Sequence, residues 1–224
     1  MDKIFPKKYL PKEKKQWYSF AIFSGILIFL FLVDLLTKIL ILKAFDNKGY
    51  LIYPKDGSSP YTTKSFTAIP GLFDMTITFN NGAAWNMLAN QKWFLSTISL
   101  IASIVLIYVF IFYFTKLNKI FKTAIVLMFA GCFGNLIDRM GFWANSGIYK
   151  YGVIDFIQFH FWKSFPVFNF ADSYLVIGLV VLVIAYILSF VKQNKPPVSE
   201  DDNLTNNKKE DLLNKLKEKE KQDE

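Results

Sequence analysis

Four long runs of apolar residues constrain this chain more than any other feature. Each has roughly 18–24 residues, which at 1.5 Å per helical residue is enough to cross a hydrocarbon core of ~30 Å. The chain is also 53% hydrophobic and contains 24 phenylalanines. The sequence therefore predicts an α-helical membrane protein with four transmembrane helices. The runs cover about residues 19–42, 93–115, 120–137 and 170–191.

Lysines beside the apolar runs predict the orientation of the chain. Six lysines lie within residues 3–15, and Lys116, Lys119 and Lys122 surround the turn between the second and third runs. By the positive-inside rule both segments face the cytoplasm, so four crossings put both termini there. These lysines also explain the net charge of +8 without a nucleic-acid partner, and we expect none.

Each of the two outer loops has its own character. In the first loop, "GYLIYP" (49–54) and "FDMTITF" (73–79) have the composition of strands. They predict a small antiparallel sheet on the membrane surface, and the second loop carries many aromatic residues. The predicted organisation is a basic cytoplasmic segment 1–18, a transmembrane domain 19–192 with a β region 46–90 and a loop or flap 138–169, and a disordered charged cytoplasmic tail 193–224.

Cysteine and histidine are too scarce for metal or disulfide chemistry. Cys132 is the single cysteine and lies within an apolar run, where we expect it to pack against a neighbouring helix. His160 is the single histidine, and neither G-x-S-x-G nor H-E-x-x-H accompanies it. We expect no metal and no cofactor.

Asp34 and Lys38 lie four residues apart near the outer end of the first run. This spacing puts them on one helix face, which favours an ion pair. An alternative is that Lys38 acts as a general base for a serine nucleophile. Ser96 and Ser173 are candidates for that serine, but no motif supports either.

More polar residues lie at the same boundary of the third and fourth runs. In the third run one helix face carries Gly131, Asn135 and Arg139, and another carries Gly134 and Asp138. At the start of the fourth run, one face carries Asn169, Asp172 and Ser173. Alternating topology brings these groups together with Asp34 and with Asp155 of the second outer loop. Four carboxylates therefore converge at the outer interface.

Two carboxylates in a partly dry pocket can share one proton and activate a water molecule for attack on a peptide carbonyl. The residues alone do not say which two of the four would do so. Two other interpretations remain open: a small proton-coupled transporter, which would favour polar groups near the membrane midplane and repeated halves, and a structural scaffold.

Five short motifs resemble one known family, the lipoprotein signal peptidases (signal peptidase II). They occur in the family's order relative to the four runs, and the similarity covers roughly residues 18–192. One departure is Trp85, where many members have Phe. The motifs are "DLLTK" 34–38, "NNGAAW" 80–85, "GNLIDR" 134–139, "VIDF" 153–156 and "FNFAD" 168–172.

The resemblance implies an aspartyl endopeptidase of the bacterial inner membrane with its active site at the periplasmic face. It would cleave diacylglyceryl-modified prolipoproteins just before the lipidated cysteine, with Asp155 and Asp172 as the catalytic pair. The implied partners are this substrate, membrane lipids and globomycin-type peptide inhibitors, and we expect a monomer. The implied substrate-binding or supporting residues are Asn80, Gly82, Asn135, Asp138, Arg139, Asn169, Ala171, Asp34 and Lys38.

Overall fold

The computed structural model describes residues 10–56, 58–82, 92–141 and 151–194. The chain divides into two compact units, Met1–Ala185 and Tyr186–Glu224. All elements described below lie in the first unit, apart from the end of the last helix.

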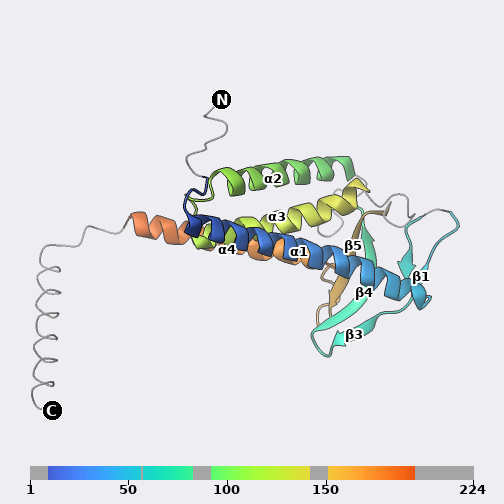
Figure 1. Ribbon diagram of the computed structural model, residues 1–224. Helices are drawn as coiled ribbons and strands as arrows, with labels where there is room; N and C mark the ends of the chain where they lie inside the picture. Colours follow the sequence, from blue (N-terminus) through green and yellow to red (C-terminus); the bar gives the residue numbers. More distant parts are fainter. Residues whose placement is uncertain (1–9, 57, 83–91, 142–150, 195–224) are drawn as a thin grey trace, which may run out of the picture. The chain divides into compact units, whose positions relative to one another are not determined.

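Four helices form most of the described structure, and each is long and apolar enough to cross a membrane. They are α1 (Lys14–Asn47), α2 (Lys92–Phe112), α3 (Lys119–Met140) and α4 (Phe170–Gln193). α1 has 34 residues, or roughly 51 Å of helix, so it continues well beyond a ~30 Å hydrocarbon core. α3 packs against both α1 and α2 (Figure 1).

The outer surfaces of the helices are apolar, as lipid requires. Ile22 and Phe29 on α1, Ile101 on α2 and Val176 on α4 are among many large hydrophobic side chains that remain exposed. Contiguous exposed apolar surface of this kind is unfavourable in water and suits a helix whose backbone groups are satisfied internally within a bilayer.

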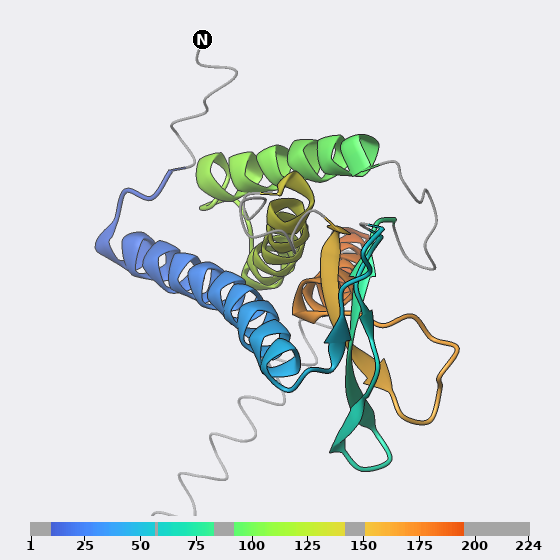
Figure 2. The same ribbon diagram turned by 90° about the vertical axis from the view of Figure 1, so that its right-hand side faces the viewer.

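Two small antiparallel sheets lie at the end of the bundle where α1 ends (Figures 1 and 2). One pairs β1 with β2, and the other has the strand order β3-β4-β5. The strands are β1 (Leu51–Ile52), β2 (Tyr61–Thr62), β3 (Phe66–Ile69), β4 (Phe73–Asn80) and β5 (Val153–Phe159).

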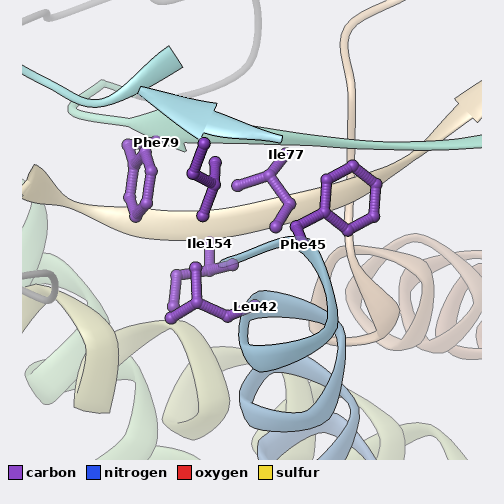
Figure 3. Close-up of a cluster of buried hydrophobic side chains, with 6 residues drawn as sticks. Leu42, Phe45, Ile77, Phe79 and Ile154 are labelled. Atoms are coloured by element: carbon purple, nitrogen blue, oxygen red, sulfur yellow. The ribbon is translucent and has the colours of Figure 1, made fainter. Parts of the chain in front are cut away.

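A buried apolar cluster fixes the three-stranded sheet to the protruding end of α1. Leu42 and Phe45 of α1 pack against Ile77 and Phe79 of β4 and Ile154 of β5 (Figure 3). All five side chains are at least nine-tenths buried. Because this cluster holds β5 on α1, it also sets the position of Asp155, the residue after Ile154.

Glycines allow α3 and α4 to approach closely. A methyl group added at Gly131 would lie 2.4 Å from the backbone oxygen of Ala171, and one at Gly178 would lie 2.7 Å from Cγ of Met128. Real side-chain contacts are not this short, so only glycine fits at these two positions. Small residues commonly permit such backbone contact between membrane helices.

The predicted fold class is confirmed: four long apolar helices accompany small antiparallel sheets. β5 is a difference, because residues 138–169 were predicted as a loop or flap. The alternation in "VIDFIQF" and its pairing with β4 explain the strand. Residues 83–85 of the second motif, including Trp85, residues 142–150 of the predicted flap, and the tail from residue 195 lie outside the described residues.

Candidate active site

A buried polar network lies where β5 meets α1, α3 and the start of α4. It contains all four carboxylates that the sequence analysis brought together, Asp34, Asp138, Asp155 and Asp172. The first three are almost fully buried, and Asp172 is partly exposed. The network therefore reaches from the protein interior to a surface that a substrate can approach.

Asp155 on β5 and Asp172 in the first turn of α4 are linked through one residue, Asn169. The side-chain nitrogen of Asn169 donates to Oδ1 of Asp155 at 2.7 Å. The backbone nitrogen of the same residue donates to Oδ2 of Asp172 at 3.1 Å. One asparagine therefore fixes both carboxylates relative to each other.

The remaining carboxylate oxygens of this pair also accept amide hydrogen bonds. Asn80 Nδ2 donates to Asp155 Oδ2 at 3.1 Å, and Asn135 Nδ2 donates to Asp172 Oδ1 at 2.7 Å. Asn80 reaches Asp155 because Thr78 pairs with Asp155 in the antiparallel register, which puts Asn80 diagonally across from it. All four oxygens of the pair thus hold one amide donor each.

Fixed donors determine which end of each asparagine faces a carboxylate. Asn80 Oδ1 accepts from the backbone nitrogen of Gly82 at 2.9 Å, and Asn169 Oδ1 accepts from that of Asp172 at 2.9 Å. Asn135 Oδ1 accepts from Lys38 Nζ at 3.2 Å. A lysine ammonium and a backbone N–H can only donate, so each asparagine must turn its NH₂ group toward the carboxylates.

Lys38 lies at the centre of a second, fully buried cluster. Its ammonium contacts Asp34 Oδ2 at 2.8 Å and Asp138 Oδ2 at 2.9 Å. The pair predicted between Asp34 and Lys38 is therefore present. An isolated buried charge is costly, and the two carboxylates together with Asn135 compensate the lysine in this cluster.

The carboxylates of this cluster also bind backbone groups that position the catalytic candidates. Asp34 Oδ1 accepts from the backbone nitrogen of Ala171 at 2.9 Å, which satisfies an N–H group in the first turn of α4. Asp138 Oδ2 accepts from the backbone nitrogen of Ile154 at 3.3 Å. α1 and α3 thereby hold the residues directly before Asp172 and Asp155.

Burial raises the pKa of Asp155 well above its usual range, and the negative charge of Asp172 raises this pKa further. The amides of Asn80 and Asn169 and the charge of Lys38 oppose the shift, because they favour the ionised form. A raised pKa means that Asp155 can hold a proton at a pH where an ordinary aspartate is ionised. The two acids can therefore share a single proton.

Arg139 lies at the rim of the site. Its guanidinium donates to Ser99 Oγ at 3.4 Å and to the backbone oxygen of Gly82 at 3.5 Å. The Gly82 contact brings α3 to the segment that follows β4. The sequence analysis included Arg139 and Gly82 but missed Ser99, which no motif identified.

Gly152 is a second residue that the sequence analysis missed. Its φ is +120°, and a methyl group there would lie 2.3 Å from the backbone oxygen of Asn80. Only glycine permits this approach, which brings the ends of β4 and β5 together beside Asp155. The glycine directly before the strand-like "VIDFIQF" was the available signal.

The serine alternative for Lys38 is not supported. Its ammonium contacts two carboxylates and an amide oxygen, and Ser173 instead donates to the backbone oxygen of Asn169. His160 contacts Asp74 on the sheet and takes no part in the network. Among the described residues, no group of three His, Cys, Asp or Glu side chains is placed to hold a metal ion.

The sequence of the chain is similar to those of known signal peptidases. The family model described as Signal peptidase (SPase) II matches residues 26–188. The chain is similar to the lipoprotein signal peptidases of Latilactobacillus sakei subsp. sakei (strain 23K), at 38% identity over 122 residues, and of Staphylococcus aureus (strain JH9), at 41% over 122 residues. These matches cover 54% of this chain and 74% and 69% of the two relatives.

Two solved structures of bacterial membrane enzymes have a similar fold. Their TM-scores are 0.60 and 0.53, at 31% and 34% identity, and the alignments cover 80% and 74% of this chain and 95% and 92% of theirs. The family match extends over the helices and strands that carry the polar network. The chain therefore belongs to the signal peptidase II family, the membrane-bound aspartic peptidases that remove signal peptides from prolipoproteins.

Proposed function

We propose that Asp155 and Asp172 are the catalytic pair, and that they cleave diacylglyceryl-modified prolipoproteins just before the lipidated cysteine. The observation that carries the proposal is the set of four amide hydrogen bonds, one to each oxygen of the two carboxylates. Among the described residues no lysine or arginine forms an ion pair with either acid. The acids are thus held in place without being locked in the ionised state.

A carboxylate has about four acceptor sites, so one amide on each oxygen leaves capacity for a water molecule. The ionised member of the pair takes a proton from this water as the water oxygen attacks the scissile carbonyl carbon. The protonated member donates to the carbonyl oxygen, giving a neutral tetrahedral intermediate. As the C–N bond breaks, a proton from the pair passes to the leaving amine. The acids titrate as a unit.

The other residues of the family-like motifs position this pair. Asn80, Asn135 and Asn169 orient the carboxylates, while Asp34, Lys38 and Asp138 fix the asparagines and the backbone beside the acids. Arg139, Gly82 and Ala171 hold the surrounding segments. The proposal includes the sheet as the surface that receives substrate, a monomeric enzyme, and inhibition by globomycin-type peptides.

The proposed location is the bacterial inner membrane, with both termini in the cytoplasm and the catalytic pair at the periplasmic face. The lysine distribution supports this orientation. The polar network lies at the end of α3 and the start of α4, and a transporter would instead favour polar groups near the midplane. The transporter alternative therefore has less support.

The decisive experiment replaces each acid singly, as Asp155→Asn and Asp172→Asn. Each variant loses one member of the proton-sharing pair, so we expect kcat to fall by roughly 10⁴-fold or more. Release of the signal peptide from a purified lipidated precursor measures this loss, and the same precursor without lipid tests the substrate class. Turnover near the wild-type rate in either variant would reject the pair.

Asp138→Asn is the matched control, because Asp138 is about as buried as Asp155 but lies outside the pair. This change removes one partner of the Lys38 ammonium, so we expect its main effect on stability. Its melting temperature in detergent should fall, whereas Asp155→Asn and Asp172→Asn should remain folded.

A further inference from the structure

A small pocket lies at the opposite end of the helices from the catalytic pair. It has a volume of about 270 Å³ and opens between the start of α1 and the turn that joins α2 to α3. Its polar lining includes Lys15, Gln16, Ser19, Thr115 and Lys122. None of these residues belongs to the catalytic network, so the pocket needs an explanation of its own.

Lys122 is the unusual member of this lining. Its side chain belongs to a residue that is only 9% exposed, and its ammonium lies 3.8 Å from the ring centre of Phe114 and 5.9 Å from that of Phe23. Among the described residues, no carboxylate lies within ion-pair distance of it. The aromatic rings stabilise this cation, but no negative charge among the described residues is paired with it.

The pocket lining contains one carboxylate, that of Glu13. Glu13 precedes α1, and its backbone oxygen accepts from the backbone nitrogen of Gln16 at 3.0 Å; two lysines face this single acid in the lining. The side-chain oxygen of Gln16 accepts from the backbone nitrogen of Lys12 at 2.9 Å, which leaves its NH₂ group as a donor. The pocket is therefore rich in donors and cations.

The pocket lies at the starts of two helices that are long and apolar enough to cross a membrane, where we expect the boundary between hydrocarbon and water. α1 begins at Lys14 and α3 at Lys119, so both direct the positive ends of their dipoles to this boundary. The exposed Trp17 and Tyr18 on α1 are residue types that settle among lipid headgroups. Exposed apolar side chains continue along α1 from Ile22 toward the membrane interior.

We propose that this pocket binds the phosphate group of an anionic phospholipid of the leaflet in contact with it. The phosphate would neutralise Lys122, with Lys15 and the NH₂ group of Gln16 as further donors. The acyl chains would follow the exposed apolar side chains of α1. A free phosphate ion would satisfy the cations but would leave this apolar surface without a partner. Basic pockets between membrane helices are known to select anionic headgroups in this way.

The test measures lipid affinity with the delipidated full-length protein in detergent. Phosphatidylglycerol is titrated against phosphatidylcholine, inorganic phosphate and the soluble headgroup glycerophosphoglycerol, with native mass spectrometry and melting temperature as readouts. We expect phosphatidylglycerol to bind more tightly than the other three. Lys122→Gln should weaken its binding by about tenfold, the typical loss for one hydrogen bond to a charged group.

Lys119→Gln is the matched control, because Lys119 lies one turn away, is exposed and does not line the pocket. It removes the same charge and should leave the affinity within about twofold. Lys122→Arg should retain binding. If Lys122→Gln does not fold, Lys15→Gln replaces it, because Lys15 is exposed and lines the pocket.

Three results would overturn the proposal. The first is equal loss of affinity in Lys122→Gln (or its Lys15→Gln replacement) and Lys119→Gln, which would indicate a diffuse surface charge. The second is full stabilisation by inorganic phosphate or the soluble headgroup, which would indicate an anion site without lipid. The third is an anionic-lipid preference that appears only after removal of residues 200–202, the acidic "EDD" of the tail, which would make the chain's own carboxylates the occupant.

Discussion

Asn80 illustrates how a neutral side chain can tune the acid that it touches. Its amide donates to Asp155 Oδ2 and thereby favours the ionised form, against the effects of burial and of the charge on Asp172. The pKa of Asp155 is still raised, so burial and repulsion outweigh the amides. The pH up to which the pair keeps its shared proton therefore depends on the balance between burial, charge repulsion and the amide hydrogen bonds.

Removal of this amide should move the pH profile of the enzyme. In Asn80→Ala the ionised form of Asp155 loses a donor, so the pKa of Asp155 should rise further. The pair would then keep its shared proton to a higher pH, so the alkaline limb of kcat/KM should shift to higher pH, with a lower maximum. The pH dependence of cleavage of a lipidated precursor measures this shift.

Thr78→Ala is the control for that measurement. Thr78 lies on the same strand, opposite Asp155 in the register, and its side chain is exposed. Its profile should overlay that of the wild type. An alkaline limb that stays in place or moves downward in Asn80→Ala would contradict the assigned role of Asn80.

Sequence reasoning at this scale predicted which carboxylates would converge but could not rank them. Four carboxylates were expected to converge, and only the family resemblance selected Asp155 and Asp172. What distinguishes them is their partners: Asp34 and Asp138 contact Lys38, whereas the selected two contact asparagine amides. Those contacts depend on distances between segments up to 137 residues apart, such as Asp34 and Ala171, and local spacing carries no such distance.

At the scale of whole elements, the contact between α3 and α4 determines whether the site can form. Asn135 reaches Asp172 only if the two helices lie close together, and Gly131 makes that possible one turn earlier on α3. The backbone oxygen of Ala171 occupies the space where a larger side chain would be. Close packing of α3 against α4 is therefore needed to hold Asp172 in position.

Gly131→Ala tests this dependence. The added methyl group would lie 2.4 Å from the Ala171 oxygen, so the helices must separate, at a cost of about 1–3 kcal/mol. We expect the melting temperature in detergent to fall by several degrees and cleavage to fall with it. Both are measured on the purified protein.

Gly25→Ala provides the comparison, because nothing lies within 4 Å of a methyl group at this position on α1. It should leave activity unchanged and stability unchanged or slightly increased, since alanine is the better helix former. Similar melting temperatures for the two variants would mean that close packing at Gly131 is unimportant.

The elements themselves were largely readable from the sequence. Three of the four apolar runs lie within helices, and the second, 93–115, extends three residues past the end of α2, because length and hydropathy largely determine which segments can cross a bilayer. β5 was missed because its pairing partner, β4, lies about 75 residues earlier, and a short alternating segment between two helices resembles a loop until that partner is known.

At the scale of the whole molecule, orientation in the membrane is the remaining prediction. The native Cys132 is first replaced by alanine, and single cysteines are then introduced as Lys48→Cys and Lys119→Cys at opposite ends of the helices. Both lysines are exposed. In intact cells a membrane-impermeant maleimide should label the first variant and should label the second only after the cells are broken.

Lys43→Cys serves as a depth control, since Lys43 is exposed near the same end of α1 as Lys48. Its labelling should follow that of Lys48→Cys. The reverse pattern, with Lys119→Cys labelled in intact cells, would place the catalytic pair on the cytoplasmic side and refute the proposed orientation.

The double role of Asn169 has a consequence for biogenesis. Its backbone and side chain donate to two acids on different segments, and the residue itself directly precedes α4, the last helix among the described residues. A nascent chain with only three helices inserted therefore contains Asp155 but lacks its counterpart and the amide between them. If the proposed pair is catalytic, hydrolysis requires the insertion of α4, so a molecule with only α1, α2 and α3 inserted has no means of cutting its neighbours in the membrane.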